Sequence, residues 1–417
     1  MLLAHKIELR PTPEQATYLL KCIGANRFSY NALLAYFQQG GVKWSKQAAY
    51  AYYKAEVRQP WMDEVTSRAP RQAIDALGAA FSKFFENVKL GRRRGKKNPF
   101  GFPQFHKRGI HDSFTMRDCD RINKHRQLER GKFYVRGRKL RIEKAPGLIL
   151  MRQKLRFAVS DTTKIRSVTV SYRAGKFFAS ILVDTENYET RFPTREPSVV
   201  GVDFGLKELA VLSCSGDHQH FPANQKLKAS LRRLRRLQRN LSRKTKGSNR
   251  REQAKRKVAR LHMRVTNQRR AVQHELSDFL TKAYQHLVIE DLAVGNMVKN
   301  RRLARAISDA GWYELRRQIE YKANLRGNTV TIAPRFYPSS RKCNACKTVK
   351  SDLKLDDRTY HCSACGHVQD RDEHAADNLE DYGLHTFAAD LKRASEIGET
   401  DEARPRRTVD KDRCEEA

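Results

Sequence analysis

The sequence predicts a multidomain protein in which a β-rich part is followed by an α/β part. Three observations lead to this prediction. Strand-like alternation of apolar and polar residues lies on both sides of a helical stretch, in residues 1–10 and 110–190. In the second half, short apolar strands each end in an acidic residue, and two Cys-x-x-Cys pairs follow them. At 417 residues the chain has room for roughly two or three domains.

The N-terminal part is expected to consist of strands interrupted by helices. Thr12, Pro13 and Gln15 form a capping box with proline at the first helical position, which predicts the start of a helix. Three helices are expected in all: residues 13–39, 45–59 and 67–88. We interpret residues 1–10 and 110–190 as a β-barrel domain and residues 11–109 as a helical insertion in it.

Asp203 is the first candidate catalytic residue. It ends the apolar run of residues 198–202, and Gly205 breaks that run soon afterwards. Because the run is short and β-branched, we expect a buried strand. An unpaired buried carboxylate costs several kcal/mol, so a metal ion is a candidate partner. The alternative is an Asp that caps a tight turn.

Two further acidic sites favour the metal. Glu290 ends the apolar run of residues 287–289, and Asp372 lies in an acidic turn that leads into a helix. Three carboxylates at the ends of separate elements are typical of a phosphodiester hydrolase in which two divalent ions about 4 Å apart activate a water and stabilise the leaving oxygen. Carboxylates are hard ligands that suit Mg²⁺ or Mn²⁺.

The charge of the chain indicates a polyanionic partner. Lys and Arg number 83 against 46 Asp and Glu, which gives a net charge of +37 and favours nucleic acid. Residues 224–275 hold 19 Lys or Arg and two acidic residues, with apolar residues at helical spacing. We expect two long helices joined near Gly247, with an apolar seam and a basic face. Such a face tracks phosphates, although charge runs are commonly just solvated. Candidate contacts are Arg232, Arg235, Arg236 and Arg256.

Arg68 and Gln72 lie near the start of the helix expected over residues 67–88. Both residue types read base edges in the major groove, and the alternative is a solvated helix face. The basic loop 89–97 is expected to contact phosphate if it contacts anything.

Four cysteines give the most specific signal. Cys343 and Cys346 are separated by fifteen residues from Cys362 and Cys365. Two Cys-x-x-Cys knuckles at this spacing supply four thiolates for tetrahedral Zn²⁺, and a reversible disulfide is the alternative. Because four cysteines leave no open coordination position, this zinc is expected to be structural. The remaining cysteines, Cys22, Cys119, Cys214 and Cys414, are scattered and are expected to be ordinary residues.

The other segments carry weaker signals. Four expectations follow: a linker over residues 184–197, one helix over 303–326, a strand over 329–332, and a disordered tail from 381 to 417. The N-terminus lacks the apolar core of a signal peptide, and no run of about 18 apolar residues predicts a membrane helix. We therefore expect no membrane partner.

Taken in order, these motifs resemble the TnpB family of transposon-encoded RNA-guided nucleases, which are related to type V CRISPR effectors. The resemblance is carried by GVDFGLK (201–207), LVIEDL (287–292), the helical stretch 300–323, the Cys₄ segment and DRDEHAADNL (370–379). FGFPQFHKR (100–108) fits as well, so the resemblance covers about residues 1–380.

The resemblance implies an RNase H-like RuvC nuclease domain with an inserted Cys₄ zinc ribbon, preceded by a β-barrel wedge domain with a helical recognition insertion. Its metal-binding acids would be Asp203, Glu290 and Asp372, holding two Mg²⁺ or Mn²⁺ ions, and Asp370 is an alternative third ligand. The implied parts are the RuvC domain (198–342 and 367–380), its basic hairpin (224–282) and the zinc ribbon (343–366).

The resemblance also implies partners. A guide RNA from the transposon end would pair with double-stranded target DNA, and the protein would read a short adjacent motif through its helical insertion, with Trp44, Arg68 and Gln72 as candidate readers. The implied protein is a monomeric ribonucleoprotein of the prokaryotic cytoplasm that associates with the nucleoid on DNA. Two alternatives remain: a guided DNA-binding repressor without cleavage, and an unguided RNase H-like transposase.

Two positions depart from the family pattern. His374 stands where Asn is commoner, and Lys347 follows the first knuckle where Gly is usual. Neither departure removes an expected metal ligand, so an active enzyme is expected.

Overall fold

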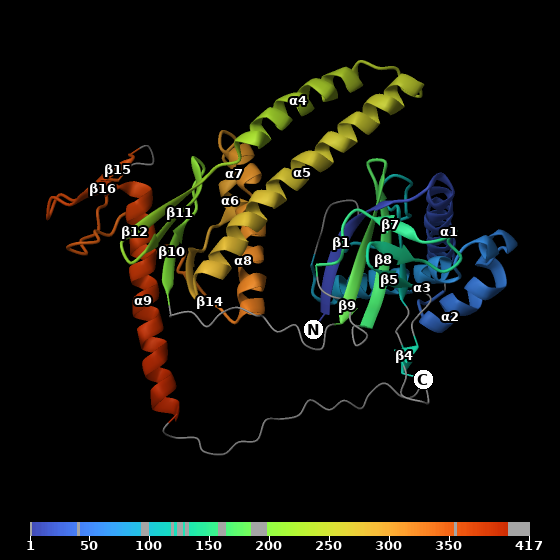
Figure 1. Cartoon of the computed structure of the whole chain (residues 1–417), viewed down its shortest axis with the longest axis horizontal. Coiled ribbons are helices and arrows are strands. Elements are labelled where there is room, and N and C mark those ends of the chain that lie inside the picture. Colours follow the sequence, from blue (N-terminus) through green and yellow to red (C-terminus); the bar gives the residue numbers. More distant parts are fainter. Residues whose placement is uncertain are drawn as a thin grey trace. The chain divides into compact units, whose positions relative to one another are not determined.

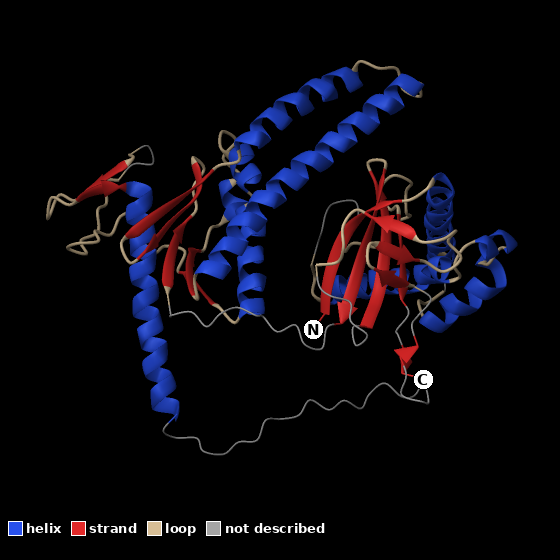
Figure 2. Ribbon diagram, in the orientation of Figure 1, coloured by secondary structure: helices blue, strands red, loops and turns tan. Residues whose placement is uncertain are grey.

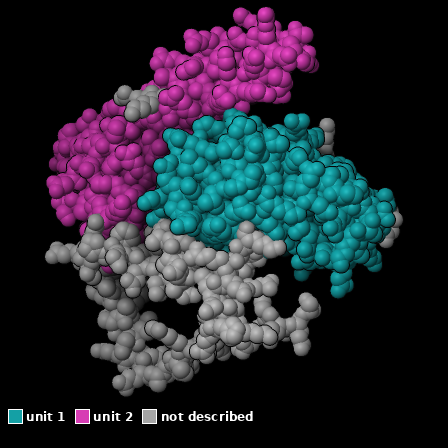
Figure 3. Space-filling view, turned by 45° about the vertical axis from the view of Figure 1, so that its right-hand side comes forward, with its two compact units in different colours: residues 1–189 teal, residues 190–417 magenta. Residues whose placement is uncertain are grey.

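The computed structural model describes residues 2–39, 42–92, 100–117, 121–122, 128–129, 133–156, 164–184, 198–353 and 357–398 (Figures 1 and 2). The chain divides into two compact units, residues 1–189 and 190–417 (Figure 3). None of the helices in the described ranges has the length and apolar character needed to cross a membrane.

Unit 1 contains a seven-stranded antiparallel sheet in the order β2-β8-β9-β1-β7-β6-β5. Its strands are β1 (Leu2–Arg10), β2 (Ser113–Arg117), β5 (Tyr134–Arg136), β6 (Lys139–Arg141), β7 (Ile149–Met151), β8 (Lys164–Arg173) and β9 (Lys176–Asp184). A separate ladder joins β3 (Arg121–Ile122) to β4 (Leu128–Glu129). Because β2 and β5 end the strand order among the described residues, closure into a barrel stays a prediction.

The helices of unit 1 follow the sequence expectations closely. They are α1 (Pro13–Gln38), α2 (Lys46–Tyr52) with a π-helical continuation (Tyr53–Val57), a 3₁₀ turn (Pro60–Glu64) and α3 (Arg68–Lys89). The predicted capping box is present, because the Gln15 backbone N–H donates to the Thr12 hydroxyl and the Gln15 side chain accepts from the Thr12 N–H.

Helix α1 joins the sheet to the other helices. Its residues Tyr18, Leu19, Cys22 and Ile23 share one hydrophobic core with the sheet. Farther along α1, Tyr30, Leu33 and Leu34 share a second core with α3. The sheet and the helices of the expected insertion share these cores and lie in unit 1, and their division into a wedge domain and an insertion stays a prediction.

Unit 2 is built on a mixed five-stranded sheet in the order β12-β11-β10-β13-β14. Its strands are β10 (Val199–Asp203), β11 (Glu208–Cys214), β12 (Asp217–Pro222), β13 (His286–Glu290) and β14 (Thr329–Ala333), with a separate hairpin of β15 (Thr359–His361) and β16 (Val368–Asp370). Its helices are α4 (Gln225–Ser242), α5 (Asn249–Ala283), α6 (Val294–Met297), α7 (Ala304–Ala310), α8 (Trp312–Arg326) and α9 (Arg371–Gly398). Strands β10, β13 and β14 run parallel, whereas β11 and β12 are antiparallel additions.

The two faces of this sheet are covered by different helices, as Figure 2 shows. Val200 and Val202 of β10 pack with residues of α5 and α8. Val199 of β10 and Val288 of β13 lie on the opposite face, where they pack with Leu379 of α9. Because side chains alternate along a strand, Asp203 and Glu290 are directed to the α9 face.

The basic hairpin of α4 and α5 forms as predicted, with its turn at Gly247. Its apolar seam includes Leu227, Leu234, Val258 and Leu261, while the arginines between them lie outside this cluster. The hairpin extends away from the sheet of unit 2 (Figure 1).

Two expectations about the C-terminal half are wrong. The single helix expected over residues 303–326 is divided into α7 and α8 at Gly311, which adopts the left-handed conformation with φ of 66°. The tail expected to be disordered from residue 381 continues helix α9 as far as Gly398.

Several expectations fall on residues outside the described ranges. They are the linker after residue 184, most of the basic loop 89–97, Cys119 and Cys414, and the tail beyond Gly398.

Candidate active site

The two strand-end carboxylates lie on adjacent parallel strands. Val202 of β10 pairs with Ile289 of β13, so the next residues, Asp203 and Glu290, occupy the same carboxyl edge of the sheet. Since both side chains are directed to the α9 face, the strand register alone brings them together. The sequence placed each acid at a strand end, and the register makes them neighbours.

Helix α9 contributes Asp372 in its first turn. The backbone of α9 packs so closely on β10 at Gly201 that no side chain fits between them. A Cβ atom on Gly201 would lie 2.0 Å from the Ala376 carbonyl oxygen and 2.4 Å from the Glu380 nitrogen. Farther toward the C-terminal end of α9, a Cβ on Gly383 would lie 2.3 Å from Val288 Cγ2. The two glycines therefore fix the height of α9 above the sheet, and with it the position of Asp372.

Asp370, the alternative third ligand, forms hydrogen bonds with the backbone at the start of α9. One of its carboxylate oxygens accepts hydrogen bonds from the backbone N–H groups of Asp372 and Glu373, at 2.9 and 3.3 Å. It thus caps the N-terminus of α9, where a carboxylate also complements the helix dipole. This leaves Asp372 as the better candidate ligand.

Asp291 is the neighbour of Glu290 in the sequence but not in the site. Its carboxylate binds Arg316 Nη1 at 2.9 Å and Arg335 Nη2 at 2.6 Å. These two guanidinium groups lower the pKa of Asp291. Asp291 is thus committed to ion pairs, whereas Glu290 is the acid directed to the α9 face.

The electrostatics at the sheet edge favour a cation. Burial, followed by the charges of Glu290 and Asp372, raises the pKa of Asp203 well above its usual range. Burial also raises the pKa of Glu290, against the opposing influence of Ser339 and Arg371. Neighbouring buried carboxylates repel each other when both are ionised, so bound cations would stabilise the ionised set. The carboxylate oxygens therefore suit hard divalent ions such as Mg²⁺.

Sequence reasoning missed two residues that hold Glu290 in place. The Ser339 hydroxyl donates to Glu290 Oε1, and Ser339 is itself buried. Asn378 of α9 donates from its side-chain nitrogen to the carbonyl oxygens of Ser339 and Lys342, each at 2.6 Å. No pattern in the sequence links these positions, because the contacts span 36 to 49 residues.

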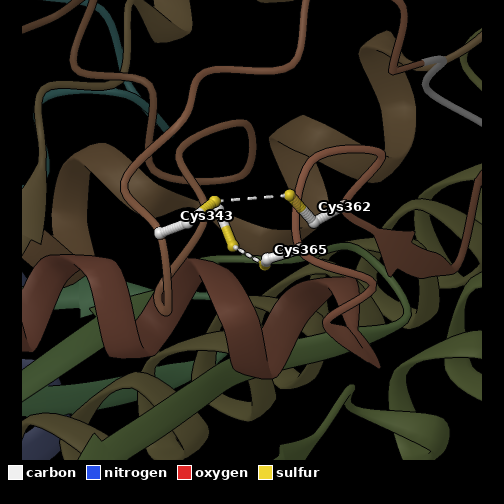
Figure 4. A group of neighbouring side chains, drawn as sticks. Cys343, Cys362 and Cys365 are labelled. Atoms are coloured by element: carbon white, nitrogen blue, oxygen red, sulfur yellow. Dashed lines mark hydrogen bonds between the residues drawn. The ribbon is translucent and has the colours of Figure 1, made fainter.

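The four predicted cysteines come together. Their sulfur atoms all lie within 4.8 Å of one another, and those of Cys343, Cys362 and Cys365 are drawn in Figure 4. Sulfur–sulfur distances are 3.7 Å for Cys343–Cys365 and 3.6 Å for Cys346–Cys362. A tetrahedral zinc with Zn–S bonds of about 2.3 Å separates its sulfurs by about 3.8 Å, so the cluster fits Zn²⁺. All four cysteines are free thiols, which argues against the disulfide alternative.

The cysteines form the only such group among the described residues. No other set of three or more His, Cys, Asp or Glu side chains within those ranges has ligand atoms close enough to share one ion. Asp203 and Glu290 at the sheet edge and Asp372 on α9 thus lack the spacing of a single-ion site. A pair of ions about 4 Å apart distributes its ligands over a wider space.

The two cysteine knuckles are built alike. The Cys343 N–H donates to the Thr348 carbonyl and the Lys347 N–H to the Cys343 carbonyl, and Cys362, His367 and Gly366 repeat this pattern. Lys347 and Gly366 occupy equivalent positions with φ of 61° and 75°. This explains why glycine suits position 347. Lys347 also pairs with Asp381 of α9 at 3.1 Å.

The other departure, His374, belongs to the interface between the ribbon and α9. It is fully buried, and its Nε2 atom accepts a hydrogen bond from the Asn344 N–H inside the first knuckle. Burial lowers the pKa of His374 to about 4, so the ring is neutral at pH 7.

The candidate nucleic-acid residues are placed as follows. Arg232, Arg235, Arg236 and Arg256 are all exposed on the α4–α5 hairpin. Arg68 and Gln72 line a cavity of about 350 Å³ in unit 1, together with Arg71, Tyr50 and Arg117. Trp44 does not line it. The Trp44 ring is partly buried against the helical core, where it stacks on Phe81 with centroids 5.0 Å apart.

Comparison with known proteins relates this chain to transposase and Cas12f1-like families. The family model described as "Probable transposase" matches residues 180–301, and the one described as "Cas12f1-like, TNB domain" matches residues 312–379. A third, described as "Helix-turn-helix domain", matches residues 1–40. There the described residues form strand β1 and the single helix α1.

Two relatives cover nearly the whole chain. A Streptomyces pristinaespiralis protein named "Putative RNA-guided DNA endonuclease" is 36% identical over 92% of this chain and 90% of its own length. The Escherichia coli protein InsQ, with the same description, is 31% identical over 90% of this chain and 91% of its own. Among solved structures, the mini-RNA-guided endonuclease CRISPR-Cas_phi3 matches 90% of this chain and 92% of that one, with 7% identity and a TM-score of 0.43.

The chain belongs to the TnpB (OrfB_IS605) family. The resemblance drawn from the order of sequence motifs is thereby confirmed.

Proposed function

We propose that this protein is an RNA-guided, Mg²⁺-dependent DNA endonuclease. The observation that carries the proposal is the placement of Asp203 and Glu290 at one sheet edge, with Asp372 acting on Asp203 from the first turn of α9, in a chain with a net charge of +37. The names of two relatives that cover about 90% of the chain point to the same activity.

Asp203, Glu290 and Asp372 would hold two Mg²⁺ or Mn²⁺ ions. Bound there, such ions supply an activated water and stabilise the leaving oxygen of the phosphodiester. The protein contributes a fixed frame: the β10–β13 register sets Asp203 beside Glu290, and Gly201 sets α9 above them. Ser339 orients the Glu290 carboxylate by its hydrogen bond.

We assign residues 198–342 and 367–380 to an RNase H-like RuvC domain, with the zinc ribbon of residues 343–366 inserted in it. The mixed sheet of three parallel and two antiparallel strands supports this assignment, as does the position of the acids at its carboxyl edge. Cys343, Cys346, Cys362 and Cys365 would hold one structural Zn²⁺, since four thiolates leave no position for a substrate.

The basic surfaces would hold the nucleic acids. The exposed arginines of the α4–α5 hairpin are suited to phosphate contacts with a guide RNA from the transposon end and with the target duplex. Arg68 and Gln72 in the unit 1 cavity are candidate readers of a short motif beside the target. Trp44, which stacks on Phe81, would support helix α3, the helix that carries Arg68 and Gln72. We propose a monomeric ribonucleoprotein.

The decisive experiment is cleavage of a plasmid library with randomised bases beside a chosen target. The protein is co-expressed with RNA from the flank of its own gene, reprogrammed to that target. Loss of plasmids only with matching RNA, Mg²⁺ and a particular adjacent motif would support the proposal.

Other outcomes select other functions. Target binding without cleavage would indicate a guided repressor, and cleavage that ignores the RNA would indicate an unguided transposase. Asp203→Ala should abolish cutting while RNA-dependent DNA binding remains. Cutting by this variant would contradict the catalytic assignment.

A further inference from the structure

We propose that the cavity beside Glu290 is a subsite for one unpaired nucleobase of the DNA strand being cut, with Tyr313 as its stacking surface. The inference rests on the proposed nuclease function and goes beyond it, because it assigns a binding site to residues outside the three carboxylates.

The cavity adjoins the candidate active site. It has a volume of about 530 Å³, within the range of about 300–1,000 Å³ that is usual for ligand pockets. Glu290 lines it, and so does Phe204, the residue after Asp203. A group bound in this cavity therefore lies beside Glu290, the candidate metal ligand that lines it.

The walls of the cavity suit a flat, partly apolar ligand. Leu292, Val294 and Trp312 give an apolar lining, and Trp312 is itself buried in the core of unit 2. A nucleotide combines a flat ring with a phosphate, and that phosphate would face the carboxylate edge. The apolar part would take the base while the phosphate stays at the edge.

Tyr313 is an aromatic ring with nothing to cover it. It is 74% exposed, although it lies in the first turn of α8 directly after the buried Trp312. Arg317 interacts with it electrostatically, and the exposed face of the ring is available for stacking. Exposed aromatic rings beside basic residues are the usual platforms for bases of single strands.

Two arginines are held in fixed positions at the same cavity. Arg316 donates from Nη1 to Asp291 at 2.9 Å and from Nε to Glu320 at 2.8 Å. Arg317 forms a bidentate pair with Glu314, with both bonds 2.8 Å long. A guanidinium has five N–H donors, so each arginine retains donors for a base edge or a phosphate. Their ion pairs orient them before any ligand arrives.

The ligand must be single-stranded. A base inside a duplex hides its faces in the stack, so only an unpaired base can stack on Tyr313. Because every base has such a face, the subsite should be tolerant of sequence. This predicts a preference for where the strand is cut without a preference for which base lies there.

The first test is photo-crosslinking. Asp203→Ala protein with its guide RNA is bound to target DNA that carries 5-iodouracil at single positions near the cut. Irradiation should join one position to the peptide that contains Tyr313, and Tyr313→Ala should lose the product. A crosslink to Phe336, which is 92% exposed and follows β14, would overturn the assignment. A crosslink to the guide RNA instead of the DNA would overturn it as well.

The second test is kinetic. Tyr313→Ala should raise KM for cleavage of single-stranded substrate roughly 5- to 150-fold with little change in kcat, because stacking is worth about 1–3 kcal/mol per base. Tyr313→Phe should recover most of the loss. Phe336→Ala, which removes an exposed aromatic ring outside the cavity lining, should leave KM unchanged.

The two proposals fail in different ways. If the unaltered protein cuts and Tyr313→Ala has the same KM, the subsite is wrong and the nuclease stands. If an abasic nucleotide at the crosslinked position weakens binding to unaltered protein and to Tyr313→Ala equally, the stacking role is wrong. If no protein cuts but the Tyr313 crosslink forms, the nuclease assignment fails and the base-binding site stands.

Discussion

The ring of Tyr360 in β15 stacks on the imidazole of His374 in α9, with centroids 3.8 Å apart and planes 13° from parallel. Both residues are fully buried. His374 is two residues from Asp372, so this stack joins the cysteine ribbon to the turn of α9 that carries a candidate metal ligand. The ribbon, which has no open coordination position, would therefore act on the active site through α9.

Replacing Tyr360 should uncouple the two parts. Tyr360→Ala removes a buried aromatic ring and should destabilise unit 2 by about 3–5 kcal/mol. A double-mutant cycle with His374→Ala, measured by urea unfolding, should give a coupling of about 0.5–1.5 kcal/mol. Additive effects of the two substitutions would mean that the stack makes no contribution of its own.

Removing thiolates that are proposed to hold Zn²⁺ should also weaken the link between the ribbon and α9. Cys343→Ser with Cys362→Ser should lower the bound zinc from about one ion per chain to none, reduce Tm and reduce DNA cleavage. Cys22→Ala, in the core of unit 1, is the control and should retain the zinc. The zinc content per chain is measured by mass spectrometry. About one zinc ion per chain in the double variant would contradict the assignment of these cysteines as zinc ligands.

Gly201 should not tolerate even one added methyl group. Gly201→Ala would place a Cβ 2.0 Å from the Ala376 carbonyl oxygen, so α9 must move, at a cost of about 3 kcal/mol or more. DNA cleavage should fall with it because Asp372 shifts.

Gly24 offers the matched control. It lies inside α1, and a Cβ there meets nothing within 4 Å. Gly24→Ala should therefore stabilise unit 1 by about 0.5–1 kcal/mol. Thermal unfolding of the two variants, side by side, distinguishes a steric effect at Gly201 from a general effect of replacing glycine.

Ser339→Ala tests whether the orientation of Glu290 matters. Loss of one hydrogen bond to a charged group is worth about 1.5–3 kcal/mol, so kcat should fall about tenfold or more while DNA affinity stays constant. Ser308→Ala, a hydroxyl that bonds only within α7, is the control. An unchanged kcat for Ser339→Ala would remove this residue from the site.

His106 should make unit 1 sensitive to acid. Its ring stacks between Tyr30 and His111, and burial, aided by His111 and Arg27, lowers its pKa from 6.5 to about 4. As the pH falls, the unfolded chain takes up the proton first, so stability is complete above pH 6.5 and declines toward pH 4. The loss should be at most about 3 kcal/mol, less after solvent screening.

Hydrogen exchange of unit 1 between pH 7.5 and pH 5 measures this decline. His106→Phe keeps the stack and removes the proton site, so its pH dependence should be weaker. Equal pH dependence in both proteins would assign the effect to another group.

The sequence by itself determined the features that depend on near neighbours in the chain. The cap at Thr12, the periodicity of α1 and α3, the basic hairpin and the spacing of the four cysteines are of this kind, because each is set by a few consecutive residues. The break at Gly311 escaped prediction because it is linked to Gln273, 38 residues away, which a Cβ at Gly311 would meet at 2.4 Å.

The tertiary structure decided which acids face each other. Asp291 follows Glu290 directly in the chain, and Asp370 lies two residues before Asp372. Strand alternation, the Arg316 and Arg335 ion pairs and the capping of α9 by Asp370 separate the members of each pair. Ser339, Asn378 and the cavity beside Tyr313 likewise depend on contacts between distant segments. Such contacts exist only once α8 and α9 are packed on opposite faces of the sheet, and packing of that kind leaves no local pattern in the chain.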